Sequence, residues 1–328
     1  MKVLKMVAGA TLALAAGASA APAWGWGCDG HQTVALVAEK HLSPAAKAMV
    51  FDLLNSNSVD PTLDRYCKDQ GPDAMTNAAT WADDERSKDP STGGWHFIDI
   101  PREAKRSEMD RYCLQPDSCV TQALQAQIAI LKDAAQAPAA RATALRFIIH
   151  LVGDMHQPLH CSTNNDRGAN CVPVTFFGIT PKLSEKNPAS EQYNPNLHST
   201  WDSYLIQTEM QDQKFPDVQQ FADYLDGEFR RKIEAWQKAG IDIDAWAWES
   251  HEAAERIAYG RLPEKIAVET PIMPPIATCA DDDDVAKRMR NLNIDLEQPY
   301  ETATMPLIEE QLEKAGVRLA MILNRLAP

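Results

Sequence analysis

Apolar side chains recur along most of this 328-residue chain at the spacing of an α-helix, and this periodicity restricts the fold most. Offsets of three and four residues place such side chains on one helical face. Strand signals are few, because only Val172, Val174 and Phe176 alternate over a short stretch between turn residues. The sequence therefore predicts a mainly α-helical single domain with at most a short β-hairpin. The segments with the helical pattern are 34–42, 145–152, 221–236 and, after Pro306, 312–326.

Turn-forming residues between these segments indicate long loops. One loop contains four consecutive aspartates, Asp281 to Asp284, which invite comparison with a calcium site. The run lacks the glycine and the glutamate of an EF-hand loop, so a solvated loop is favoured over a calcium site. The predicted loops are 61–72, 89–94, 164–168, 181–195 and 271–284.

The formal charge of −14 argues against a broad basic surface for duplex DNA. A nucleic-acid substrate is still compatible with this charge if metal ions hold it locally, because bound cations can be the largest charges in a site. The hydrophobic content of 45% suits a soluble globular domain with a large core.

The amino-terminal segment has the order of an export signal. Lys2 and Lys5 precede an apolar stretch that ends in small residues, and this stretch is too short to span a membrane. Cleavage is acceptable after Ala20, Ala23 or Gly25. A buried first helix is the alternative, but no polar face interrupts the run. We expect an exported protein, periplasmic or secreted, without stable membrane association and monomeric.

The seven cysteines are compatible with disulfides in an oxidising compartment. Cys113 and Cys119, like Cys161 and Cys171, are close in sequence and form the simplest loops to close. An odd total leaves at least one thiol unpaired within a monomer. Zinc binding by cysteine is the alternative, but the sequence contains no C-x-x-C pair.

Histidines and carboxylates occur at metal-ligand spacings. His150 and Asp154 are four residues apart in a predicted helix, so both side chains project from one face about one turn apart. His198 and Asp202 repeat this spacing. Two helices that each offer an imidazole and a carboxylate can hold a metal between them, although a single pair of this kind also arises by chance on helix surfaces.

Further candidate ligands flank these pairs. Pro158 ends the helix before His160, so His160 can turn away from the helical face and reach a second metal. His156 lies two positions from Asp154, about 200° around the helix, and is interpreted as a structural histidine. Upstream, His31, Asp83 and His96 add two imidazoles and a carboxylate.

Five blocks of such residues follow one another along the chain: Trp26-Gly-x-x-Gly-His31, Trp81-Ala-Asp83, Trp95-His96-Phe-Ile-Asp99, His150-x-x-Gly-Asp154-x-His156-Gln-Pro-Leu-His160 and Asn196-Leu-His198-x-x-Trp-Asp202. In this order they resemble the zinc-dependent single-strand nucleases and 3′-nucleotidases of the S1/P1 type, which are related to zinc phospholipase C. The resemblance extends from Trp26 to the final helix and implies one nuclease domain, 26–328. Only the segment from about 268 to 298 does not fit the family pattern, and we interpret it as a loop insertion.

The resemblance implies a helical fold of the phospholipase C and single-strand nuclease type with three zinc ions. The implied ligands are nitrogen and oxygen atoms, as zinc catalysis requires. One ion takes Asp83, His96, His150 and Asp154, the second takes His31, Asp154 and the amino nitrogen and carbonyl oxygen of Trp26, and the third takes His160, His198 and Asp202.

The second ion depends on where the export signal is cut. The family ligand is a mature amino-terminal tryptophan five residues before the histidine, and cleavage after Gly25 places Trp26 there. Cleavage after Ala20 or Ala23 would leave extra residues and put the amine ligand in doubt. An α-amino group with a pKa near about 8 can bind zinc at neutral pH, because ligation displaces the proton.

The implied activity is hydrolysis of single-stranded RNA and DNA to 5′-phosphate products by a zinc-bound hydroxide, with removal of 3′-phosphate from nucleotides. Catalytic roles fall to Asp83, Asp154 and Arg86, and Arg86 also supports the phosphate. Phe97 and Asp99 match residues that stack on a base and hydrogen-bond it, and Asn170 matches a position near the substrate. Taken alone, Arg86 also fits a surface ion pair and Phe97 an ordinary core residue.

Two alternative functions use the same ligands. A zinc phospholipase C would hydrolyse a lipid phosphodiester, but the sequence shows no apolar or basic anchor segment outside the export signal. A periplasmic zinc-binding protein would explain the ligands but not the residues of a base pocket. His41 and His251 match no ligand block and are predicted to lie at the core edge and on the surface, respectively.

Overall fold

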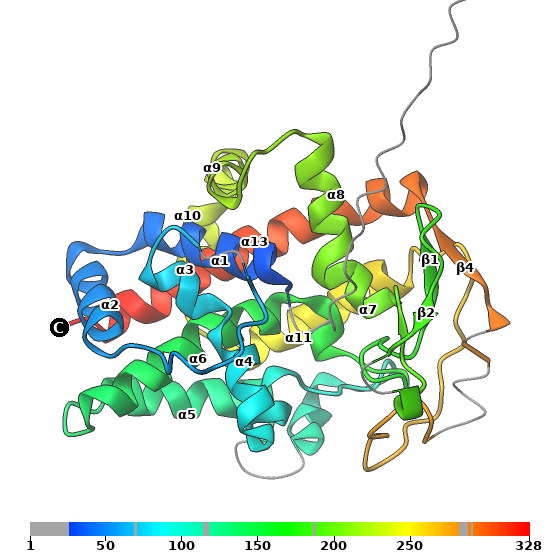
Figure 1. Ribbon diagram of the computed structural model, residues 1–328, viewed down its shortest axis with the longest axis horizontal. Coiled ribbons are helices and arrows are strands. Elements are labelled where there is room, and N and C mark those ends of the chain that lie inside the picture. Colours follow the sequence, from blue (N-terminus) through cyan, green and yellow to red (C-terminus); the bar gives the residue numbers. More distant parts are fainter. Residues whose placement is uncertain (1–25, 69–70, 114–117, 186–187, 282–287, 290) are drawn as a thin grey trace, which may run out of the picture.

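The computed structural model describes residues 26–68, 71–113, 118–185, 188–281, 288–289 and 291–328. Helices make up most of this part, which confirms the mainly α-helical fold (Figure 1). The predicted export signal, 1–25, lies outside the described residues. No helix in the described part of the chain is long and apolar enough to cross a membrane.

The long carboxy-terminal helix α13 (Gln298–Leu326) and helix α6 (Pro138–His156) form the centre of the molecule. α13 contacts α1 (Cys28–His41), α6, α9 (Val218–Glu228) and α10 (Arg230–Ala239), and α6 packs on α5 (Val120–Lys132). α1 and α13 approach closely at Gly316, where an added Cβ would lie 2.4 Å from Val37 Cγ1. The periodic segments predicted as helices therefore supply the core.

Helix α6 is the element on which the site is built. It begins at Pro138, and the missing amide proton of proline costs nothing there because the first amides of a helix have no intrahelical acceptor. Every residue from Ala144 to His156 is buried, so this part of the helix is enclosed on all sides. The helix ends where Gln157 turns extended before Pro158, as the sequence predicts. The chain then forms the short helix η3 (Pro158–Cys161).

Two helices differ from their predicted extents. The apolar pattern from Phe221 to Trp236 is divided between α9 and α10, because Phe229 between them departs from helical geometry. Helix α13 begins before Pro306 and continues through it. Tyr300 and Met305 are buried on the added turns and anchor them to the core.

The strands are short, and the first pairs with a strand that is distant in the sequence. The predicted strand forms as β1 (Val174–Phe176), but it pairs in parallel with β4 (Ile294–Leu296), with Val174 opposite Ile294. It is therefore not half of a hairpin, and its partner comes from the segment interpreted as an insertion. β2 (Lys182–Leu183) and β3 (Tyr193–Asn194) form a small antiparallel pair within a predicted loop.

Three disulfides form among the described residues: Cys28–Cys67, Cys113–Cys119 and Cys171–Cys279. The prediction for Cys113 and Cys119 is confirmed. The pairing of Cys161 with Cys171 is wrong, because Cys161 is a buried free thiol at the end of η3. Sequence proximity favoured the wrong partner, whereas the fold brings Cys279 to Cys171 across 108 residues.

The remaining elements connect these parts. The predicted loop 89–94 is mostly a 3₁₀ helix, because η1 spans Pro90–His96. The other elements are α2 (Pro44–Ser56), α3 (Ala74–Ala79), α4 (Trp81–Lys88), η2 (Arg106–Tyr112), η4 (Pro188–Ser190), α7 (Leu197–Ser199), η5 (Thr200–Tyr204), α8 (Leu205–Asp212), α11 (Ile243–Ala253) and η6 (Ala254–Tyr259).

Candidate metal centre

Buried histidines and aspartates from separate elements converge in the interior. Within each of three groups, one possible ligand atom per residue lies within 4.8 Å of those of the others. All of these side chains are buried, in a protein interior where charged groups need partners. The groups are His31, Asp83 and His150; His96, His150 and Asp154; and His160, His198 and Asp202.

Helix α6 supplies the central pair. His150 Nε2 lies 3.0 Å from Asp154 Oδ2, one turn along the helix. His150 Nδ1 donates a hydrogen bond to the carbonyl oxygen of Ala79 at 2.6 Å, which directs Nε2 toward the centre. A hydrogen bond of this kind fixes the orientation of a metal-binding imidazole. The predicted spacing of four residues thus does place both side chains together.

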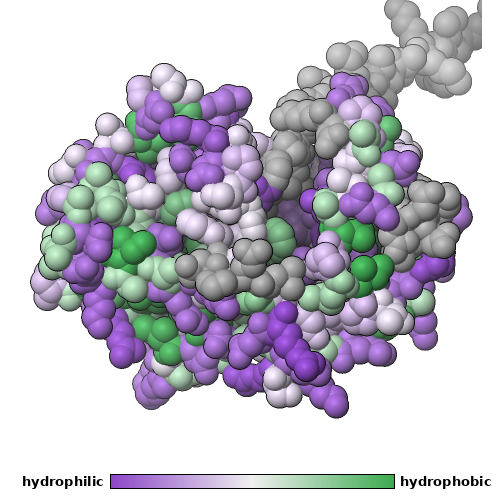
Figure 2. All heavy atoms as spheres, turned by 90° about the horizontal axis from the view of Figure 1, so that it is seen from below, coloured by the Kyte–Doolittle hydropathy of each residue, from purple (hydrophilic) through white to green (hydrophobic). Residues whose placement is uncertain are grey.

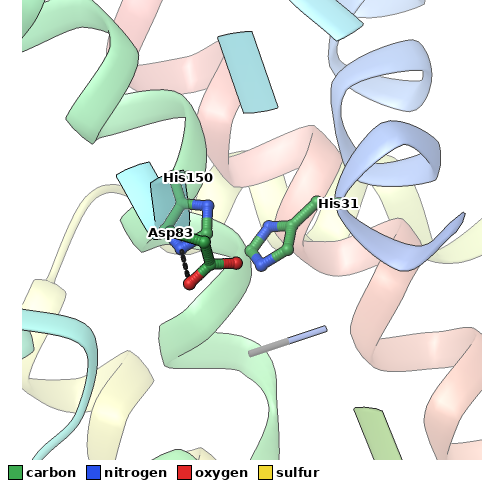
Figure 3. A group of neighbouring side chains, drawn as sticks. All are labelled: His31, Asp83 and His150. Atoms are coloured by element: carbon green, nitrogen blue, oxygen red, sulfur yellow. Dashed lines mark ion pairs between the residues drawn. The ribbon is translucent and has the colours of Figure 1, made fainter. Parts of the chain in front are cut away.

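Asp83 and His96 approach this pair from α4 and from the end of η1. His96 Nδ1 lies 2.9 Å from Asp154 Oδ2 and 3.7 Å from Asp83 Oδ1. His150 Nε2 is also 3.7 Å from Asp83 Oδ1, the ion pair drawn in Figure 3. Two imidazoles and two carboxylates therefore surround one small volume.

His31 completes this part of the centre from helix α1 (Figure 3). Its ring stacks on the ring of His150, with centroids 4.0 Å apart. Its Nε2 lies 3.3 Å from Asp154 Oδ1. The close approach of α1 to α6 needs a glycine, because a Cβ on Gly153 would lie 2.8 Å from His31 Nδ1.

Trp26 lies at the same place, as the first described residue. Its side chain is fully buried, and Gly153 and Gly30 both face it. The amide of the next residue, Gly27, donates a hydrogen bond to the carbonyl oxygen of Asp202 at 2.7 Å. The backbone next to Trp26 is thereby bonded to Asp202, a residue of the third group.

The third group lies where η3, α7 and η5 meet. The rings of His160 and His198 are stacked, with centroids 4.9 Å apart, and His198 Nε2 is 3.3 Å from Asp202 Oδ2. The Nδ1 atoms of the two histidines donate to backbone carbonyls, of His96 at 2.7 Å and of Gly168 at 2.6 Å. Both Nε2 atoms are left to face Asp202.

The donor set fits a metal such as zinc, because several buried atoms in these groups have no hydrogen-bond partner among the described residues. Each unpaired buried polar atom costs about 1–3 kcal/mol. Imidazole nitrogens and carboxylate oxygens are ligands that zinc accepts. The atoms without a hydrogen bond are His31 Nδ1 and Nε2, Asp83 Oδ1, His96 Nε2, Asp154 Oδ1, His160 Nε2 and Asp202 Oδ2.

The electrostatics of the groups also suit metal binding. Burial lowers the pKa of His31 to about 4 and that of His96 to about 3, so both imidazoles are neutral at pH 7. Burial acts to raise the pKa of Asp154, but the charges of His150 and His160 outweigh it and hold this pKa well below its usual value. His31 and His96 are thus neutral beside an ionised Asp154, which are protonation states that metal ligation needs. Burial acts to lower the pKa of His150, but the charges of Asp154 and Asp83 outweigh it and raise this pKa to about 9, so a bound metal would displace a proton there.

A pocket of about 340 Å³ opens beside His96. Phe97 and Asp99, the predicted base-binding residues, both line it, and the side chain of Phe97 is 38% exposed. Burial raises the pKa of Asp99 to about 7, against the charge of Arg167. Figure 2 shows a hollow with a hydrophilic floor on one face of the molecule. The other lining residues are Gly94, Ile98, Tyr112, Ser118, Cys119, Pro275 and Ile276.

The segment interpreted as an insertion forms part of this pocket. Its first described stretch, 268–281, is joined to the loop after η3, since Asn164 and Asn165 hydrogen-bond the backbone at Glu269, Thr270 and Ile272. The Cys171–Cys279 disulfide adds a covalent link. Most of the run Asp281 to Asp284 lies outside the described residues, but Asp281 accepts backbone hydrogen bonds in an exposed turn.

Two arginines lie near the groups. Burial lowers the pKa of Arg86 to about 10, against the charges of Asp83 and Asp154. Arg167, which the sequence analysis missed, interacts electrostatically with Asp99 and His198. Its positive φ of 58° marks a tight turn, and the only signal in the sequence was its place in the predicted loop 164–168.

The other predicted residues lie outside these groups. Asn170 does not line the pocket, and its side chain hydrogen-bonds Gln192 and the carbonyl oxygen of Arg167. His156, the last residue of α6, is buried, and Arg318 donates a hydrogen bond to its Nε2. His251 is also buried, so the prediction of a surface histidine is wrong: its Nδ1 lies 3.2 Å from the carbonyl oxygen of Cys161.

Comparison with known proteins identifies similar sequences over almost the whole chain. The model of the S1/P1 Nuclease family matches residues 26–328. Nuclease S1 of Aspergillus oryzae is 28% identical over 332 residues, which cover 98% of this chain and 96% of that protein. Nuclease P1 of Penicillium citrinum is 28% identical, with 92% and 97% covered, and Endonuclease 2 of Arabidopsis thaliana is 26% identical, with 92% and 90% covered.

Proposed function

Because the chain belongs to the S1/P1 nuclease family, we propose that its mature form cleaves single-stranded RNA and DNA to 5′-phosphate products and removes 3′-phosphate from nucleotides. The chain is a hydrolase of phosphodiester bonds, as the nucleases to which it is similar indicate. The observation that supports the proposal most is the convergence of buried, unpaired nitrogen and oxygen atoms in three adjacent groups.

The groups have the ligands for three zinc ions. When bound, zinc lowers the pKa of a water molecule toward neutrality and stabilises negative charge on a phosphate. Asp154 serves two of the ions because it lies between His31 on one side and His96 and His150 on the other. We assign Asp83, His96, His150 and Asp154 to one ion, His31, Asp154 and Trp26 to the second, and His160, His198 and Asp202 to the third.

Residues of the chain position the phosphodiester around this centre. The Arg86 guanidinium, half-buried beside Asp83, supplies a fixed positive charge for a phosphate oxygen. The pocket beside His96 takes the adjacent base: Phe97 offers a ring on which the base stacks, and Asp99 offers hydrogen bonds to its edge. A base must leave its stack to enter such a pocket, which favours single strands over duplexes.

Replacing Phe97 by alanine should lower kcat/KM for single-stranded oligonucleotides about 10-fold to 100-fold, because base stacking on an aromatic ring is worth about 1–3 kcal/mol. The measurement is steady-state cleavage of an intact oligonucleotide and of one with an abasic site at the cleaved position. Wild type and Phe97→Ala should cleave the abasic substrate with equal kcat/KM. Phe177→Ala is the matched control, since this ring is similarly exposed, at 41%, and does not line the pocket. An equal loss in both variants would contradict base stacking at Phe97.

Export explains both the disulfides and the amine ligand. Disulfides persist in oxidising compartments, so we place the mature monomer in the periplasm or outside the cell. We expect the intact mass of the mature protein to equal that of a chain that starts at Trp26. A form that keeps one extra residue before Trp26 should bind less zinc than the processed form, because a peptide nitrogen does not replace an amine as ligand. Equal zinc content in the two forms would remove Trp26 from the ligand set.

A further inference from the structure

A second kind of metal-ligand cluster lies at the junction of three helices, outside the candidate metal centre. It consists of His41 at the end of α1, Asp226 on α9 and Glu313 on α13. His41 Nε2 lies 2.8 Å from Asp226 Oδ1 and 3.8 Å from Glu313 Oε1. We call these three residues the helix-junction cluster. His31 and His41 are ten residues apart on α1, or about 15 Å along the helix, so the cluster is separate from the candidate metal centre.

The partner that the described residues offer the carboxylate of Glu313 is the imidazole of His41, 3.8 Å from Oε1, which is beyond hydrogen-bond distance. The Glu313 side chain is fully buried, and neither carboxylate oxygen accepts a hydrogen bond from the described residues. Burial raises its pKa. An unpaired buried carboxylate costs several kcal/mol, and such groups in proteins are paired or bind metals. Lys40 is near enough to act on Glu313 through its charge, but its ammonium pairs with Asp223.

The chemistry and spacing of the cluster match a zinc-class divalent cation. Imidazole nitrogens and carboxylate oxygens are ligands that zinc accepts, and a site with three protein ligands keeps a fourth position for water. Ligands about 2.1 Å from a tetrahedral ion lie about 3.4 Å apart, and the 2.8 Å and 3.8 Å separations in the cluster bracket this value. The side chains of His41 and Asp226 are 17% and 30% exposed, which gives an ion and its water access from solvent.

We propose that the helix-junction cluster binds one zinc-class divalent cation, and that this ion fastens α1 to α9 and α13. The three ligands come from three helices, so a bound ion would add a cross-link to the packing, the Lys40–Asp223 ion pair and the hydrogen bond from Asn324 to the carbonyl oxygen of His41 that already join them. α1 also carries His31, so the ion stabilises the helix that supplies one histidine of the candidate metal centre. The proposal adds an ion to those expected from the family and does not depend on nucleic-acid hydrolysis.

The test compares zinc content per chain in mature wild-type protein and in Glu313→Gln and Asp226→Asn, after dialysis against free zinc and then metal-free buffer. Both variants should hold one zinc ion fewer than wild type. Zinc-edge anomalous scattering from wild-type crystals should show a peak between His41, Asp226 and Glu313. Glu228→Gln, an exposed charge removal on α9, is the control and should keep the wild-type content.

Unchanged zinc content in Asp226→Asn, or no anomalous peak at the cluster, would overturn the proposal and leave a shared proton as the partner of Glu313. Asp226 is partly exposed, so its substitution is decisive even if Glu313→Gln fails to fold. Because the readout is bound metal, failure of this proposal leaves the nuclease assignment standing, and loss of the nuclease assignment leaves this test unaffected.

Discussion

Replacing Asp154 by asparagine is expected to abolish most hydrolysis of single-stranded DNA, with a loss of more than about 100-fold in kcat/KM. Asp154 contacts three imidazoles within 3.3 Å: His31, His96 and His150. Asparagine keeps the shape but loses the negative charge, and its NH₂ group cannot act as a ligand. Mutation of residues that merely support metal ligands costs about 10-fold to 100-fold, so loss of a shared ligand should cost more.

The matched control is Asp84→Asn, the same change at a buried aspartate on α4. Asp84 pairs with Arg65 at 2.6 Å and belongs to none of the three groups, so its loss should reduce stability but not zinc content. The measurements are kcat/KM, zinc per chain and the midpoint of thermal unfolding. Full activity in Asp154→Asn, or an equal loss of zinc in both variants, would contradict the shared-ligand role.

Replacing Gly153 by alanine should reduce zinc content and lower activity about 100-fold, although alanine favours helices over glycine by about 1 kcal/mol. The new Cβ would lie 2.8 Å from His31 Nδ1 and 3.1 Å from His31 Cε1. The ring of His31 already stacks on His150, so it cannot move aside without leaving Asp154. Zinc per chain and kcat/KM for single-stranded DNA measure the effect.

Two other glycine substitutions separate this effect from a general loss of stability. Gly227→Ala in α9 meets nothing within 4 Å, so it should leave zinc content and activity unchanged. Gly316→Ala in α13 places a Cβ 2.4 Å from Val37 Cγ1 and should destabilise the fold by about 1–3 kcal/mol while keeping zinc. Wild-type zinc and activity in Gly153→Ala would show that His31 is not required at its observed position.

The sequence predicts the helices and the metal-ligand pairs because both depend on local geometry. Four residues of α-helix bring His150 to Asp154 without any knowledge of the fold. The same spacing brings His198 to Asp202, even though η5 in that region is a π-helix. Local periodicity is thus sufficient where a pair lies within one helical segment.

Features that depend on contacts between distant segments escaped prediction. The parallel pairing of β1 with β4 and the Cys171–Cys279 disulfide join the loop after η3 to the segment 268–298. His251 appeared to be a surface residue because nothing in its local sequence shows that α11 packs against η3. Arg167 was missed for the same reason, since only the folded loop brings its charge near Asp99.

The same limit applies to the pocket beside His96. Phe97 and Asp99 were predicted from a motif, whereas Pro275 and Ile276 come from the part of the chain that did not fit the family pattern. No local signal connects these residues with Phe97 across more than 170 positions. The pocket wall is therefore a property of the fold and of the segment interpreted as an insertion.

The most direct test of the zinc-dependent nuclease assignment is cleavage of a single-stranded oligonucleotide by the mature protein before chelation, after chelation and after zinc is returned. We predict that cleavage to 5′-phosphate ends stops on chelation and returns with zinc, while phosphatidylcholine is not hydrolysed in any of the three states. Cleavage that persists in the metal-free protein, or zinc-dependent hydrolysis of phosphatidylcholine without cleavage of the oligonucleotide, would contradict it.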